Sequence, residues 1–109
     1  MTQTARRIAR AFAEGKRLRI KNTETDGQHV WHHRNLIARR NADGTVDCTL
    51  AGWGTVTTRD RLNAICGAVG SFGRFYQLQF EQFYQPDYRE AIPVVPAVEL
   101  STRDWVTVQ

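Results

Sequence analysis

The sequence lacks the features that define several classes of protein. Its 109 residues include two cysteines, three prolines and one methionine. No apolar run approaches the roughly 18 residues that a membrane span needs, and no signal-peptide hydrophobic region is present, so we expect a cytoplasmic protein with no membrane partner. A Walker loop, a nucleophile elbow and paired carboxylates are also missing. We therefore expect no enzymatic activity and no cofactor.

The few cysteines and histidines form no recognised site. Cys48 and Cys66 lie inside apolar patterns, which in a reducing cytosol favours buried thiols over a disulfide. A nucleophilic Cys66 is disfavoured, because it falls near the end of a predicted helix, whereas thiolates are stabilised at helix N-termini. The histidines His29, His32 and His33 share no ligand spacing with the cysteines, so we predict an exposed His-rich strand, with a metal site as the minor alternative.

Positive charge is concentrated in the first part of the chain. Residues 1–40 hold ten Lys and Arg against three acids, a net of +7, and residues 41–109 have a net of −3. This asymmetry favours a side that faces a polyanion, with solubilising surface charge as the alternative interpretation. The candidate nucleic-acid-binding residues are Arg6, Arg7, Arg10, Arg17, Arg19, Lys21, Arg39 and Arg40.

Two helices are predicted. In the first, over Thr4–Glu14, Thr4 is the expected N-cap, Gly15 ends the helix, and the apolar stripe is Ala5, Ile8, Ala11 and Phe12. The second, over Thr57–Val69, follows a Gly-rich turn. Here Thr57 and Asp60 have the spacing of a capping box, Gly70 can end the helix, and the apolar face is Leu62, Ile65, Cys66 and Val69.

The turn before the second helix has two possible roles. Gly52 to Thr58 could hold an anion at the helix N-terminus, but the glycine spacing and the lysine of a P-loop are missing, so a structural turn is the favoured interpretation. The residues nearby that could contact a partner are Trp53, Arg59 and Arg61.

Alternating patterns predict strands on both sides of the second helix. Over Arg17–Thr23 the cations Arg17, Arg19 and Lys21 point the same way, about 6.6 Å apart, which suits either a phosphate backbone or a guarded edge strand. Asp26-Gly27 is a turn signal, Gln28–Arg40 is extended with a bulge near Arg34-Asn35, residues 41–44 form a hairpin loop, and Thr45–Leu50 is a strand with Val46, Cys48 and Leu50 inward.

The last third of the chain is aromatic and extended. Phe72–Phe80 is predicted as a strand that places Tyr76, Leu78 and Phe80 on one face and Phe75 on the other. Phe75, together with Tyr84 or Tyr88, could then stack on bases or on a protein partner. After Pro86 we expect an extended segment, with Pro93 and Pro96 flanking Val94-Val95, that packs over the domain and ends in an edge strand over 105–108.

The middle third carries a family resemblance. Trp53, Thr55, Thr57-Thr58-Arg59 and Arg61-Leu62-Asn63 fit the pattern Gly-Trp-x-Thr-x-Thr-Thr-Arg-x-Arg-Leu-Asn, and Asn35-Leu36-Ile37-Ala38 upstream belongs to the same resemblance. The chain thus resembles a group of small uncharacterised proteins encoded by tailed bacteriophages. The resemblance implies a phage origin and the cytoplasm of a bacterial host, and it implies no activity.

Together these patterns predict a single α+β domain. Its parts are a basic helix and strands over 1–40, a hairpin and capped helix over 41–70, and an aromatic strand and Pro-interrupted segment over 71–109. We expect an antiparallel sheet of four or five strands with both helices on one face. The first hypothesis is binding of nucleic acid, or of a host complex that handles it. The second is an antagonist of a bacterial defence or host enzyme complex, and the third a small enzyme or metal protein that uses the histidines.

Overall fold

The computed structural model describes residues 1–89 and 95–109. Two helices and nine strands follow one another along the chain. They are α1 (Gln3–Ala13), β1 (Leu18–Ile20), β2 (Thr23–Thr25), β3 (His29–His32), β4 (Asn35–Arg40), β5 (Val46–Thr49), α2 (Val56–Ala68), β6 (Arg74–Leu78), β7 (Glu81–Gln85), β8 (Val98–Leu100) and β9 (Trp105–Thr107).

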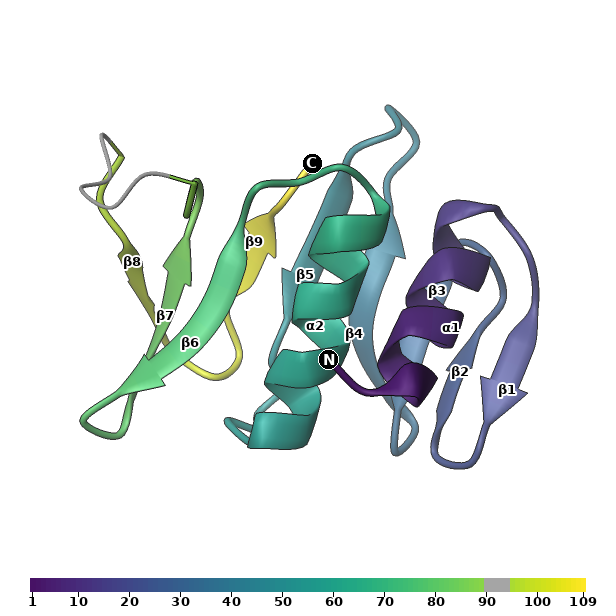
Figure 1. Cartoon of the computed structure of the whole chain (residues 1–109), viewed down its shortest axis with the longest axis horizontal. Helices are drawn as coiled ribbons and strands as arrows, with labels where there is room; N and C mark the ends of the chain where they lie inside the picture. The colour runs from purple at the N-terminus through teal and green to yellow at the C-terminus, as the bar shows by residue number, and fades with distance from the viewer. Residues whose placement is uncertain (90–94) are drawn as a thin grey trace.

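The strands form one large and one small antiparallel sheet. The large sheet has the order β1-β2-β3-β4-β5-β9, and the small sheet has the order β6-β7-β8. Both helices cover the same face of the large sheet, and the small sheet stands beside α2 (Figure 1). The predicted α+β class with two helices on one face is confirmed. The sheet has six strands instead of four or five, because the chain forms hairpins at sites without glycine signals and because β9 adds to β5.

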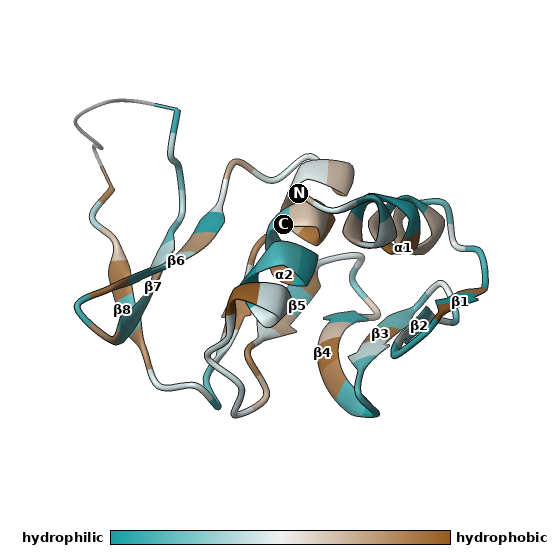
Figure 2. Ribbon diagram, turned by 60° about the horizontal axis from the view of Figure 1, so that its bottom comes forward, coloured by the Kyte–Doolittle hydropathy of each residue, from teal (hydrophilic) through white to brown (hydrophobic). Residues whose placement is uncertain are grey.

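The core lies between the helices and the large sheet. The predicted stripe of α1 is buried, and Phe12 at its end is fully enclosed. From α2, Leu62, Ile65 and Cys66 are buried, and they belong to the same cluster as Ile37 and Cys48 of the sheet along with the other buried apolar residues. Figure 2 shows the two helices on one side of the large sheet and no helix on the other.

Both helices end as predicted but begin at other residues. Gly15 and Gly70 have positive φ values of 71° and 78°, and the N–H of Ser71 donates to the carbonyl of Cys66, so α2 ends in a Schellman motif. The predicted N-caps Thr4 and Thr57 are wrong. Thr2 caps α1, and Thr55 caps α2 by accepting from the N–H of Thr58.

The strand from Arg17 is shorter than predicted. Lys21 has a φ of +53° and turns the chain into β2, so it does not continue the row of Arg17 and Arg19 on one strand. A second turn without glycine, at His33-Arg34, closes the hairpin between β3 and β4 with φ values of 49° and 68°. The bulge predicted near Arg34-Asn35 is therefore not at that position. The register of the β3–β4 pair shifts between Val30 and Trp31 instead.

The aromatic strand of the last third also differs from its prediction. β6 ends at Leu78, because Gln79 and Phe80 form a hairpin turn with φ values of 49° and 68°. Phe75 is buried against Tyr84 at a ring separation of 4.8 Å. The edge strand predicted at 105–108 is confirmed as β9. The prediction for Pro93 and Val94 lies outside the described residues.

Candidate nucleic-acid interface

The face of the large sheet that no helix covers is the candidate interface. Two rows of paired residues place side chains on this outer face. One crosses from β1 to β4 as Arg19, Glu24, Trp31 and Leu36, and the other crosses from β3 to β9 as His29, Arg39, Asp47 and Thr107. The register shift in the β3–β4 pair allows both Leu36 and Arg39 to face outward while Ile37 and Ala38 between them are buried.

A group of cations lies near Trp31 at one end of this face. We call Arg17, Arg19, Lys21, Trp31 and Arg34 the outer patch. Arg17 and Arg34 line a hollow with Trp31, and Arg34 also lines a second hollow with Arg19 and Lys21. Glu24 lines both hollows, and Asp26 lines the first. None of these four cations forms an ion pair with an acidic side chain of residues 1–89 and 95–109.

Aromatic rings continue from the patch across the face. The rings of His29 and Trp31 lie 5.3 Å apart, and the guanidinium of Arg39 lies 4.0 Å from the ring centre of Trp105. Trp31 on β3 and Trp105 on β9 are separated by three strand spacings, roughly 14 Å. Trp105 is exposed, and His29 and Trp31 are half-buried. Accessible rings beside cations are the arrangement with which open sheets bind single-stranded nucleic acids.

The eight predicted cations do not form one surface. Arg6, Arg7 and Arg10 are exposed on α1, which lies over the opposite face of the sheet from Arg17 and Arg19. Arg10 is also paired with Glu14 at 2.9 Å. The structure thus brings together Arg17, Arg19 and Lys21 and separates them from the α1 group.

Two of the predicted cations have structural contacts. The guanidinium of Arg40 donates to the carbonyl oxygen of Phe12 at 2.9 Å and lies over the Phe12 ring, so it satisfies the C-terminal end of α1. Arg39 donates to Asp47 at 3.3 Å while it covers Trp105. Of the two, only Arg39 is on the outer face.

Sequence reasoning missed Arg34, Trp31 and Trp105 as site residues. Arg34 was missed because it lies in a two-residue turn, His33-Arg34, in which both φ values are positive. Such a turn is usually recognised in a sequence by a glycine, and none is present here. The opposite parity of Val30 and Trp31 was the available signal for Trp31, since Val30 is buried and its neighbour on a strand must face away.

The predicted partner-binding residues separate into exposed and structural sets. Trp53 and Tyr88 are exposed, at 57% and 54%. Phe75 and Tyr84 are buried, so they cannot stack on a ligand as predicted, and burial raises the pKa of Tyr84 to about 12.

Arg59 and Arg61 link elements of the fold. The Arg59 guanidinium donates to Gly54, Gln77 and Gln82, which ties the start of α2 to the β6–β7 hairpin. Arg61 donates to the hydroxyls of Thr2 and Thr23 and to the carboxylate of Asp60.

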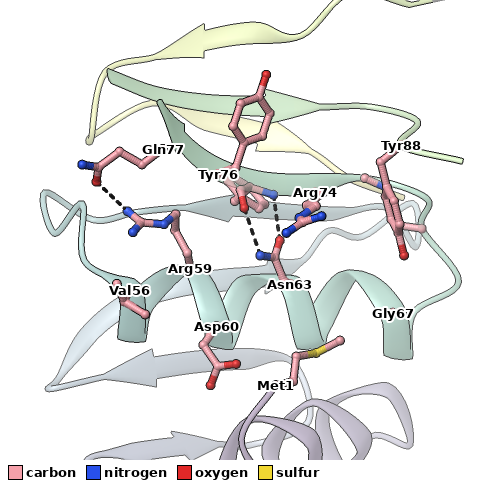
Figure 3. A pocket seen from close by; sticks show the side chains of 13 residues that line it. Met1, Val56, Arg59, Asp60, Asn63, Gly67, Arg74, Tyr76, Gln77 and Tyr88 are labelled. Carbon is pink, nitrogen blue, oxygen red and sulfur yellow. Dashed lines mark hydrogen bonds between the residues drawn. The ribbon is translucent and has the colours of Figure 1, made fainter. Parts of the chain in front are cut away.

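A pocket of about 610 Å³ lies between α2 and β6. Figure 3 shows Arg59 pointing to Gln77, and the amide of Asn63 pointing to the backbone of β6. That amide donates to the carbonyl of Phe75 and accepts from its N–H at 2.7 Å, so it closes the free edge of β6. Asp60 is likewise bonded to Thr2 and Arg61. These polar groups already serve the fold, so the pocket offers few of them to a ligand.

The histidines and cysteines are placed apart. His32 is buried with its Nδ1 3.0 Å from the Thr23 hydroxyl, His33 lies in a turn, and His29 contacts Asp26. No three His, Cys, Asp or Glu residues of the described chain are grouped as metal ligands. Both cysteines are free and buried, as predicted, and burial raises the pKa of the Cys66 thiol to about 12, which opposes a nucleophilic role.

The architecture defines a small α+β protein with one sheet face that no helix covers and on which charged and aromatic side chains lie side by side. A family model described as Kyanoviridae Gp96 protein matches residues 1–107, and the chain belongs to this family of cyanophage proteins. The comparisons with curated proteins and with solved structures found no match. Within the described residues, no helix has the length and apolar character to cross a membrane.

Proposed function

We propose that the protein is a non-enzymatic phage protein that binds single-stranded nucleic acid across the outer face of its large sheet. The observation that carries the proposal is the outer patch, in which Arg17 and Arg34 line a hollow with Trp31 and two further cations, Arg19 and Lys21, line the neighbouring hollow. None of the four forms an ion pair with an acidic side chain of the described residues. Cations neutralise phosphates and supply sequence-independent affinity, and exposed rings stack on unpaired bases. A host complex that handles nucleic acid would present single-stranded nucleic acid to the same face of the protein.

Charged and aromatic side chains continue across the outer face beyond the outer patch. Arg19 and Trp31 lie on strands two positions apart in the sheet, and Arg39 and Trp105 continue the same face to its other edge. A strand that runs across the sheet can therefore place phosphates near the cations and bases on Trp31 and Trp105. The cations of α1 lie on the other side of the sheet and serve as an internal control.

Salt dependence of binding tests this proposal. We compare the parent with an outer variant, Arg17→Gln, Arg19→Gln and Arg34→Gln, and with a matched α1 variant, Arg6→Gln, Arg7→Gln and Arg10→Gln. On a single-stranded oligonucleotide, the outer variant should lower the slope of log affinity against log salt by about two, at about 0.7 for each phosphate that is no longer neutralised. The α1 variant should leave the slope unchanged.

Equal slopes for the parent and the outer variant would contradict the proposal. A reduced slope in the α1 variant alone would move the interface to the helix side. The six replaced side chains are all exposed, so the unfolding transitions of both variants should match that of the parent, which thermal denaturation can verify.

A second candidate function is antagonism of a host enzyme complex, and the β6–β7 hairpin favours it. Phe80 in the turn is 92% exposed, and Leu78 nearby is 59% exposed. Phe80 also has a positive φ, which is rare for an aromatic residue. An exposed apolar tip is typical of a protein contact. Replacing Leu78 and Phe80 by Ser should abolish capture of a nuclease-resistant host complex if this function is correct, and should not change oligonucleotide binding.

A further inference from the structure

A pocket of about 470 Å³ opens between the β3–β4 turn and the start of α2. Its volume falls in the range of small-molecule sites, and the residues that line it are His32, His33, Asn35, Trp53, Thr55, Thr57 and Thr58. None of these side chains is a carboxylate, an ammonium or a guanidinium. The chemistry of the lining therefore suits a neutral group with polar edges better than a phosphate.

Trp53 forms an exposed wall of this pocket. The preceding turn at Ala51-Gly52, with φ values of 54° and 89°, and a hydrogen bond from the Trp53 N–H to the Leu50 carbonyl place the residue outside the core. With 57% of its surface exposed, the indole is free to stack on a planar ligand.

His32 contributes a polar atom from within the protein. The residue is 7% exposed, and its Nδ1 lies 3.0 Å from the hydroxyl of Thr23. Its Nε2 has no partner in the described part of the chain. Because no fully buried side-chain nitrogen or oxygen there lacks a partner, Nε2 must reach an opening, and the pocket is the opening that His32 lines.

The neighbours of His32 favour a proton on Nε2. Arg61 donates to the Thr23 hydroxyl at 3.2 Å, so the hydroxyl is left to donate its own proton to Nδ1. A neutral His32 then presents an N–H donor to the pocket. The amide nitrogen of Asn35 donates to the His33 carbonyl, which leaves its oxygen as an acceptor.

We propose that this pocket binds one unpaired nucleobase, stacked on Trp53 with its polar edge toward His32 and Asn35. A nucleobase is planar, neutral and carries donors and acceptors on its edge, as the lining requires. His33 lines both this pocket and the hollow that holds Arg19, Lys21 and Arg34, so the phosphate next to a docked base lies beside the outer patch.

If the bound base is part of a nucleic-acid strand, this proposal rests on the proposed function. The same pocket could instead take the base of a free nucleotide, so the experiment distinguishes the two. The probes are the four nucleoside 5′-monophosphates, ribose 5-phosphate, and a single-stranded oligonucleotide. Dissociation constants are measured for the parent, Trp53→Leu and the matched control Phe80→Leu, which replaces an exposed aromatic residue outside the proposed interface. Asn35→Ala serves as a second variant of the pocket.

We expect at least one monophosphate to bind the parent and ribose 5-phosphate to bind at least tenfold more weakly. Trp53→Leu should weaken binding of that monophosphate by about tenfold, in keeping with the loss of one base–aromatic stack, and Phe80→Leu should not. A parallel loss of oligonucleotide affinity in Trp53→Leu assigns the base to a strand. Unchanged oligonucleotide affinity assigns the site to a free nucleotide.

Two results would overturn the pocket. The first is that the monophosphates bind no more tightly than ribose 5-phosphate, or do not bind at all. The second is that the parent, Trp53→Leu and Asn35→Ala bind the monophosphate with equal affinity. The outcomes are separable from the proposed function. A salt slope lowered by the outer variant supports the interface even if the pocket fails, and monophosphate binding that depends on Trp53 supports the pocket even if the slope does not change.

Discussion

The two faces of the large sheet differ in chemistry although they alternate along the same strands. Under the helices the side chains are apolar and buried, as at Val30, Ile37 and Val46. On the outer face, Arg19, Trp31 and Arg39 remain accessible, and cations stand beside rings. The fold needs only the inner face for its core, which leaves the composition of the outer face free for binding.

The largest difference between the faces should appear in stability. Ile37 and Leu36 are adjacent, but Ile37 is 1% exposed in the core and Leu36 faces outward, half-buried. We expect Ile37→Ala to lower the free energy of unfolding by about 2–5 kcal/mol, because it leaves a cavity. Leu36→Ala should cost at most about 1 kcal/mol, because less apolar surface is lost from the folded state. Chemical denaturation measures both, and equal costs would show that the two faces are not distinct.

The buried imidazole of the inner face should make stability depend on pH. Burial, then the nearby charges of His33 and Arg61, lower the pKa of His32 to about 4, below the value near 6.5 of an unfolded chain. Between these pH values the unfolded state binds a proton that the native state does not. Stability should therefore fall as pH drops from 6.5 to 4, with a slope of up to about 1.4 kcal/mol per pH unit.

The variant His32→Asn isolates this titration, because an amide can replace Nδ1 as the partner of Thr23 but does not ionise. Denaturation midpoints are measured between pH 7 and pH 4 for the parent and the variant. A parent and variant with the same pH dependence would place the imidazole of His32 in water.

The smallest expected change in stability concerns the N-terminus of α2, where one threonine caps the helix and another faces solvent. The Thr55 hydroxyl accepts from the Thr58 N–H, and Thr57 is exposed. We expect Thr55→Ala to cost about 0.5–2 kcal/mol and Thr57→Ala to cost less than about 0.5 kcal/mol. If thermal denaturation gives the reverse order, Thr57 is the cap after all.

Periodic segments and glycine ends were predictable from the sequence. The stripe of α1, the inward residues of β5 and the helix ends at Gly15 and Gly70 follow from spacing and from the φ preference of glycine. N-caps were not predictable, because each helix has more than one threonine close to its start, and spacing alone does not choose among them.

The aromatic hairpin and the site were harder to predict, for physical reasons. The segment around Phe75 has aromatic side chains at both parities, so alternation does not say which face is buried. Long-range contacts decide it: Asn63 holds the backbone of Phe75, and Gly73 leaves room for the Tyr84 side chain, whose hydroxyl a Cβ atom at residue 73 would overlap. Likewise, the charge asymmetry indicated a polyanion surface, but only the register of the sheet separates Arg19 from the cations of α1.

Mapping of an oligonucleotide onto the protein by NMR tests the central claim most directly. On titration with a single-stranded oligonucleotide, we expect the indole N–H signals of Trp31 and Trp105 and the amides of β1 to shift in a saturable way. The amides of α1 around Arg6 and Arg10 should not shift. Shifts confined to α1, or no saturable shift on the outer face, would contradict binding by the open face of the sheet.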